Sequence, residues 1–109
     1  MDEAQRRRWH QQHVASWLQL AATLRTEGWE AQVTCSAAPV QIEGSLLNGD
    51  RFYFRARHSD VSLSIGGDDP ADIPEWEDSE SHQEASYLPA AAGEAIIRRL
   101  ARRYLSDVS

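Results

Sequence analysis

Carboxylates are the most concentrated chemical groups in this chain. Eight of them lie between residues 68 and 84, with no arginine among them. Oxygen ligands at this density could hold calcium, but the EF-hand spacing is absent, and Pro70 and Pro74 interrupt the run. We therefore expect no metal here, and either a solvated loop or an acidic, DNA-mimicking surface for a partner with a basic surface. The eight are Asp68, Asp69, Asp72, Glu75, Glu77, Asp78, Glu80 and Glu84.

A second concentration of charge is basic and aromatic. Arg51, Tyr53, Arg55 and Arg57 alternate with apolar residues, so all four project from one face of an extended segment. Arginines interleaved with aromatic rings can bind nucleic acid, but one ring and a net charge of -6 disfavour that function. We expect a protein contact here. Nucleic-acid-associated regulation, through this face or through the arginines near the C-terminus, is the alternative.

The histidines, serines and single cysteine give no catalytic or metal-binding motif. His10 and His13 are one helical turn apart, without a CxxC or HExxH spacing. His58, Ser59 and Asp60 are adjacent, but adjacency does not bring a nucleophile, a base and an acid into mutual reach, and no G-x-S-x-G turn is present. We predict a non-enzymatic protein without metal or cofactor; a small enzyme with an unrecognised site is the remaining alternative.

Two amphipathic helices should frame the chain, one near residues 2–27 and one near 89–105. Gly28 is placed to end the first helix, and Pro89 to begin the second. Arg6-Arg7-Arg8 covers too wide an arc to be buried, which indicates a solvated helix start or a docking patch for an acidic partner. The apolar stripes comprise Trp9, His13, Trp17, Leu20 or Ala21, and Leu24 in the first helix, and Ile96, Ile97, Leu100, Ala101 and Tyr104 in the second.

Residues 29–66 alternate apolar and polar side chains with the period of two that a half-buried strand requires. Turn residues divide them into four antiparallel strands in sequential order. In the first strand Cys35 falls on the apolar side, so we expect it to be a small buried residue opposite Val40.

Parity restricts the register of these strands, because a slip of one residue would turn every apolar side chain to solvent. A three-residue loop at Asn48-Gly49-Asp50 would pair Gly44 with Phe54 and Glu43 with Arg55; a five-residue loop has the same parity and remains open. The next reversal, at His58, requires a loop of two or four residues.

Composition restricts the class of protein. The 109 residues suit one domain with one core, and a lone cysteine excludes an internal disulfide. No apolar run reaches the roughly twenty residues of a membrane span, and the first residues lack the apolar segment of a secretory signal, so a cytoplasmic protein is expected. All eleven basic residues are arginine, which favours a bacterial genome of high GC content.

These elements predict a single α+β domain over residues 1–109. It has two layers: an N-terminal helix, a four-stranded antiparallel meander, a long acidic loop over 68–86, and a C-terminal helix. Ile73 and Trp76 should fix the start of the loop, whereas the stretch from Asp78 to Glu84 should be mobile.

The expected function is that of a small acidic protein-interaction module. The element order resembles that of double-stranded RNA-binding domains, but the basic cluster that such domains carry at the start of the second helix is missing. Secretion chaperones and toxin-immunity proteins are similar in size, charge and layering, a likeness of fold without a shared motif. The partner is an unidentified protein, and a homodimer through an edge strand or sheet face is a further expectation. Expected contacts are Asp68, Asp69, Glu75, Trp76, Glu77, Asp78, Arg51, Tyr53, Arg55 and Arg57.

Overall fold

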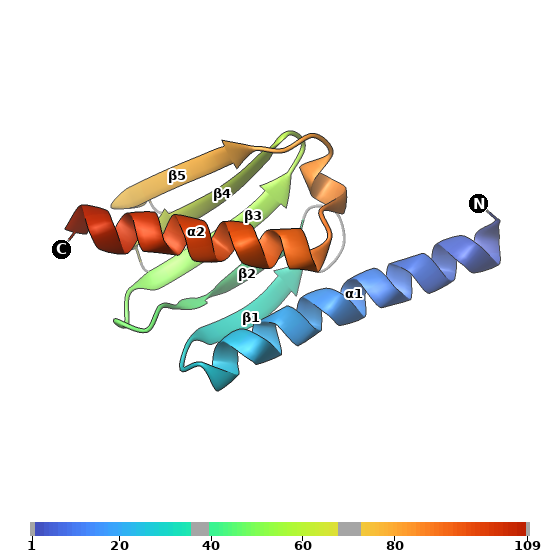
Figure 1. The fold of residues 1–109 in the computed structure, drawn as a ribbon, viewed down its shortest axis with the longest axis horizontal. Helices are drawn as coiled ribbons and strands as arrows, with labels where there is room; N and C mark the ends of the chain where they lie inside the picture. The colour runs from blue at the N-terminus through green and yellow to red at the C-terminus, as the bar shows by residue number, and fades with distance from the viewer. Residues whose placement is uncertain (1, 36–39, 68–72, 109) are drawn as a thin grey trace.

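The computed structural model describes residues 2–35, 40–67 and 73–108. Two helices pack on one face of an antiparallel sheet, so the predicted α+β fold is confirmed, with five strands in place of four. In chain order the elements are α1 (Glu3–Thr26), β1 (Glu30–Cys35), β2 (Val40–Ser45), β3 (Arg51–Arg57), β4 (Asp60–Ile65), β5 (Trp76–Ser81), the 3-10 turn η1 (Ala85–Tyr87) and α2 (Ala90–Val108) (Figure 1).

The fifth strand lies in the segment that was expected to be a loop. The strands follow one another in the order β1-β2-β3-β4-β5, and β5 pairs antiparallel with β4, with Ile65 opposite Trp76 and Val61 opposite Glu80. The prediction of a loop over 68–86 is therefore wrong for residues 76–81. The stretch from Asp78 to Glu84, which was expected to be mobile, begins with residues of β5 that are paired with β4. Residues 68–72 lie outside the described residues.

The register between β2 and β3 follows the five-residue loop. Gly44 lies opposite Phe52 rather than Phe54, and Leu46 N donates to Asp50 O at 2.9 Å to close the loop. The parity of the pairing is therefore as expected. The three-residue loop is wrong, and the register of β3 against β2 differs by two residues from the one that it predicted. As a result, Glu43 lies opposite Tyr53, and the predicted pairing of Glu43 with Arg55 does not form.

The other reversals are closer to expectation. The loop between β3 and β4 has two residues, His58 and Ser59, with Arg57 opposite Asp60. In the β1–β2 pair the register shifts between Val33 and Cys35, so Cys35 lies opposite Gln41 instead of Val40 and is only half-buried. The turn that joins these two strands, residues 36–39, lies outside the described residues.

The core is organised around Trp17 of α1, which is fully buried. Its ring lies 6.1 Å from that of Phe54 on β3, and its Nε1 donates to the carbonyl oxygen of Leu88 at 3.2 Å. Where α1 meets α2, the ring lies directly over Gly93. A Cβ at residue 93 would overlap the ring, with Cζ3 only 2.9 Å away. Gly93 therefore permits the close approach of the two helices.

We expect Gly93→Ala to destabilise the protein by about 1–3 kcal/mol, because the added methyl group overpacks against Trp17. Helix propensity alone predicts the opposite sign, a gain of about 1 kcal/mol. Urea unfolding followed by tryptophan fluorescence measures the change. Ala91→Gly, at an exposed position of the same helix, is the control that reports propensity without packing. Equal or greater stability of Gly93→Ala would contradict the close packing.

Candidate functional site

The sheet face opposite the helices, called the outer face from here on, carries the basic residues that the sequence indicated. Arg51, Tyr53, Arg55 and Arg57 occupy alternate positions of β3, while the residues between them are buried in the core. No described helix lies on the outer face, because the buried stripes of α1 and α2 both join the core on the other side. The structure therefore places all four side chains together on one open surface.

Arg55 is the most constrained of the four. Its Nη2 donates to the Tyr53 hydroxyl at 3.2 Å, and its guanidinium carbon lies 5.1 Å from the centre of the Tyr53 ring. The register places Gln41 and Ser62 directly beside it, and Ser79 one strand beyond Ser62, all of them uncharged. Its Nε is shielded from solvent and has no hydrogen-bond partner in the part of the chain that the structure describes. Arg55 thus has donor capacity that the fold does not satisfy.

The arginines of the outer face form no ion pair with the carboxylates that the structure describes. Among the described residues, none of Arg51, Arg55 and Arg57 forms an ion pair, although Arg57 lies opposite Asp60 in the register. By contrast, Arg98, Arg99 and Arg103 of α2 all have carboxylate partners. Unpaired arginines on an open face are available to an external acidic group.

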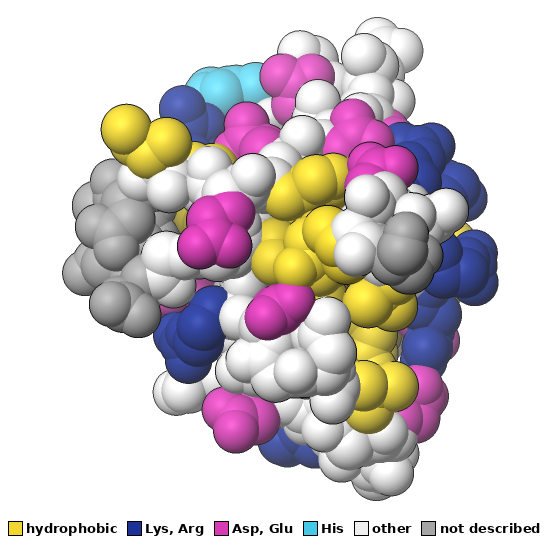
Figure 2. All heavy atoms as spheres, turned by 90° about the vertical axis from the view of Figure 1, so that its left-hand side faces the viewer, with side chains coloured by type: hydrophobic (Ala, Val, Ile, Leu, Met, Phe, Trp, Pro, Cys, Tyr) yellow, Lys and Arg dark blue, Asp and Glu magenta, His cyan; other side chains and the backbone are white. Residues whose placement is uncertain are grey.

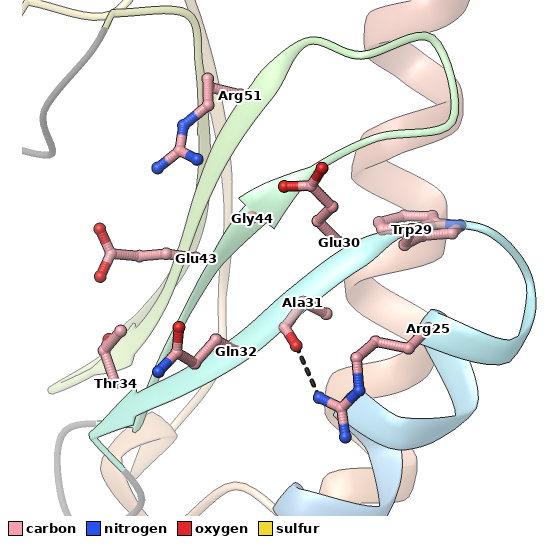
Figure 3. A pocket seen from close by; sticks show the side chains of 9 residues that line it. All are labelled: Arg25, Trp29, Glu30, Ala31, Gln32, Thr34, Glu43, Gly44 and Arg51. Carbon is pink, nitrogen blue, oxygen red and sulfur yellow. Dashed lines mark hydrogen bonds between the residues drawn. The ribbon is translucent and has the colours of Figure 1, made fainter.

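Two hollows lined by described residues adjoin β3, one at the β1 edge of the sheet and one beside the β3–β4 loop. The larger, of about 420 Å³, brings side chains from α1 and three strands together: Arg25, Trp29, Glu30, Ala31, Gln32, Thr34, Glu43, Gly44 and Arg51 (Figure 3). The smaller, of about 310 Å³, is lined by Arg55, Arg57, His58, Asp60, Ser62, Glu77 and Ser79. Both contain arginines and carboxylates, so the outer face presents both signs of charge within hollows of side-chain size.

Local backbone geometry shapes the larger hollow. A side chain at Gly44 would overlap the carbonyl group of Glu30, so β1 can approach β2 this closely only over a glycine. At the rim, Arg25 Nη1 donates to the Ala31 carbonyl oxygen at 2.7 Å, drawn as the dashed line in Figure 3. That bond satisfies a backbone acceptor on edge strand β1 and fixes one arginine in place.

The acidic residues predicted as contacts divide between the two faces of the sheet. Glu77 lies on the outer face, where its Oε2 accepts from the Ser64 hydroxyl at 2.7 Å, and Glu75 is exposed before the strand. Trp76 and Asp78 alternate with them and face α2. Asp68 and Asp69 lie outside the described residues.

On the inner side, the carboxylates of β5 pair with arginines of α2. Glu80 accepts from Arg99 Nε and Nη2 at 2.7 and 2.8 Å and lies 3.2 Å from Arg103, which also pairs with Asp78 at 3.1 Å. The Arg99 hydrogen bonds hold the pKa of Glu80 below its ordinary value of 4.5. The pKa of Asp78 is also lowered, first by the Ser79 backbone N–H and then by Arg103. Sequence reasoning missed this network. The signal for it is that residues 76, 78 and 80 are two apart, so that in a strand all three side chains would lie on one face.

Figure 2 views the molecule from the end where α2 finishes and shows apolar side chains surrounded by charged ones. Trp76 Nε1 donates to Asp107 at 3.0 Å, and its ring meets Tyr104 edge-on at 5.4 Å. The Tyr104 hydroxyl in turn donates to Asp50, which raises the pKa of Tyr104 to about 12. These bonds attach β5, α2 and the β2–β3 loop to one another.

The histidines do not form a metal site among the described residues, where no group of three potential ligands occurs. His13 is buried under Trp9, and this burial, followed by the charge of His10, lowers the pKa of His13. In the β3–β4 loop, His58 has a φ of 56°, in the left-handed region, and its backbone N–H donates to the Ser86 hydroxyl at 3.0 Å. None of the helices, as far as they are described, is long and apolar enough to cross a membrane.

We expect Glu80→Gln to lower the free energy of unfolding at pH 7 by about 1 kcal/mol, because it removes the charge that Arg99 and Arg103 share. The folded-state pKa of Glu80 is depressed, so its contribution is present above the unfolded value of about 4.5 and is lost as the pH falls through the folded pKa. The stabilities of wild type and variant should therefore converge in acid.

Urea unfolding at neutral and acidic pH tests this expectation. Glu77→Gln is the matched control, because Glu77 lies on the same strand but has no arginine partner among the described residues. A difference between wild type and Glu80→Gln that stays constant with pH would contradict the role of the Glu80 charge.

Comparison with known proteins adds no relative: no family model, no curated protein and no solved structure matches this chain.

Proposed function

We propose that this protein is a non-catalytic protein-interaction module whose contact surface is the outer face. One observation carries the proposal: three arginines of β3 share an open sheet face with Tyr53 and have no ion-pair partner among the described residues. Arginine and tyrosine are the residue types that contribute most binding energy at protein interfaces. The chemistry of this face fits a partner with acidic side chains.

The hollows on either side of β3 support a protein as the ligand. Each combines guanidinium groups with carboxylates, in volumes of about 420 and 310 Å³. A protein surface can meet such a mixture, since it offers both hydrogen-bond donors and acceptors and both signs of charge. The acidic residues give less support to a contact with a basic partner, because Asp78 and Glu80 already pair with α2.

Nucleic-acid binding is the second candidate, because arginines beside an aromatic ring also suit single strands. The net charge of -6 repels a polyanion, and Tyr53 is the single aromatic ring among the β3 residues of this face. Within the protein-binding class, a chaperone-like or immunity-like role, in which the module covers one specific partner, is the form that we favour.

Affinity capture from the source cells tests the proposal. Tagged wild type should retain a specific protein that Arg55→Glu retains at least about tenfold less, because reversing a central charge at an interface costs several kcal/mol. Arg102→Glu, an equal charge change at an exposed position of α2, is the matched control and should retain the partner.

Circular dichroism first establishes that both variants are folded. If every captured protein binds Arg55→Glu as well as wild type, the outer face is not the contact surface. Capture that is lost after nuclease treatment would favour the nucleic-acid alternative instead.

A further inference from the structure

The N-terminal part of α1 extends beyond the sheet. Figure 1 shows α1 running past β1 toward the N-terminus, in a molecule that measures 49 Å along its longest axis and 29 and 23 Å along the others. Residues 2–12 are all exposed, whereas the second half of the helix carries the buried stripe. We call residues 3–12 the arm.

The arm is held in a helix by its own contacts. Asp2 accepts from Gln5 N at 2.7 Å while the Gln5 side chain accepts from Asp2 N at 2.9 Å, which is a complete capping box. Glu3 and Arg7, four residues apart, lie 3.6 Å from each other. A binding surface on the arm would therefore be ordered before a partner arrives.

The side chains on the arm change along the line of the buried stripe. Steps of three and four residues back from His13 and Trp17 lead to Trp9, His10 and Arg6. In the second half of α1 this stripe is mostly apolar and covers the sheet. In the arm the same stripe carries an aromatic ring, an imidazole and a guanidinium. The stripe continues beyond the domain with the chemistry of a recognition surface.

The charge of the arm is opposite to that of the whole protein. Arg6 and Arg8 have no ion pair among the described residues, and Arg7 contacts only the exposed Glu3. Three arginines against one glutamate form a positive patch that runs around the helix, on a chain with a net charge of -6. Such a patch is complementary to a short acidic segment.

An aromatic groove lies beside the patch. It has a volume of about 350 Å³ and is lined by α1 and the start of α2. Trp9, expected on the buried stripe, is in fact 41% exposed, and its ring stacks on His13 at 4.8 Å. Tyr87, 59% exposed, lies 6.3 Å from Trp9. Two partly exposed rings at a groove offer a seat for an apolar side chain.

We propose that the arm and this groove form a second binding surface, which takes an acidic peptide segment of a protein partner. Its carboxylates bind arginines among positions 6, 7 and 8, and an apolar side chain enters the groove that Trp9 and Tyr87 line. A peptide fits better than nucleic acid, because the groove requires an apolar group and the negative charge of the domain opposes a long polyanion. The proposal is independent of the outer face.

Fluorescence anisotropy with a defined probe tests the proposal. The probe is a fluorescein-labelled peptide of glutamates flanking a leucine-phenylalanine pair, and a second peptide has glutamine in place of glutamate. We expect saturable binding of the acidic peptide alone, weakened about tenfold or more by the double substitution Arg6→Gln and Arg8→Gln. Arg102→Glu matches the change in net charge and should bind as wild type does.

Trp9 supplies an independent readout of the groove. Trp9→Ala should also weaken binding about tenfold, whereas Trp9→Phe, which keeps an aromatic ring over His13, should retain most of it. Circular dichroism and urea unfolding establish that each variant is folded.

Several outcomes would overturn the proposal. One is binding of the acidic peptide that does not saturate, and another is binding to the double arginine variant that is as tight as to wild type. Loss of peptide binding in Arg55→Glu instead would place the peptide on the outer face. Tighter binding of a short duplex DNA would assign the arm to nucleic acid, and a doubled mass in light scattering that Trp9→Ala abolishes would assign it to a second copy of the chain.

Discussion

Trp17 is the contact on which the arrangement of the layers depends. One buried ring touches the sheet at Phe54, packs directly over Gly93 of α2, and donates a hydrogen bond to Leu88 in the segment that leads into α2. Because interiors are close-packed, a ring that fills the space between three elements fixes their distances from one another. Both helices are thereby held on one face of the sheet, and the outer face stays free of described helices.

The edge of the sheet is stabilised in a different way from its centre. Across β2, β3 and β4 the inward positions are apolar, but on β5 they are Trp76, Asp78 and Glu80. Arg99 and Arg103 of α2 neutralise these carboxylates, in a layer exposed enough that neither charge is fully desolvated. The ion pairs bind α2 to the edge strand.

An acidic protein therefore presents two separate surfaces with arginines that have no ion-pair partner among the described residues. On the outer face the strand register gives Arg55 uncharged cross-strand neighbours, Gln41 and Ser62, so it has no ion pair among the described residues. The arm has unpaired charge because α1 is long: the helix carries Arg6 to Arg8 beyond the sheet and away from the carboxylates of the sheet. At the ionic strength of a cell, charges more than about 8 Å apart are largely screened, so a short acidic segment responds mainly to the arginines beside it, whereas a long polyanion also meets the carboxylates of the rest of the surface.

The sequence by itself determined the two helices, the parity of four strands and the composition of the outer face, because these follow from local periodicity. It could not determine β5, because the residues of this strand show no apolar alternation. The inward carboxylates of β5 form ion pairs with arginines about twenty residues later in the chain. Nor could it choose between loops of three and five residues, which have the same parity. That choice separates Glu43 from Arg55. The unpaired state of Arg55 and the projection of the arm were decided only by the tertiary structure, because each depends on which residues lie beside a side chain in space, and local periodicity carries no information about that.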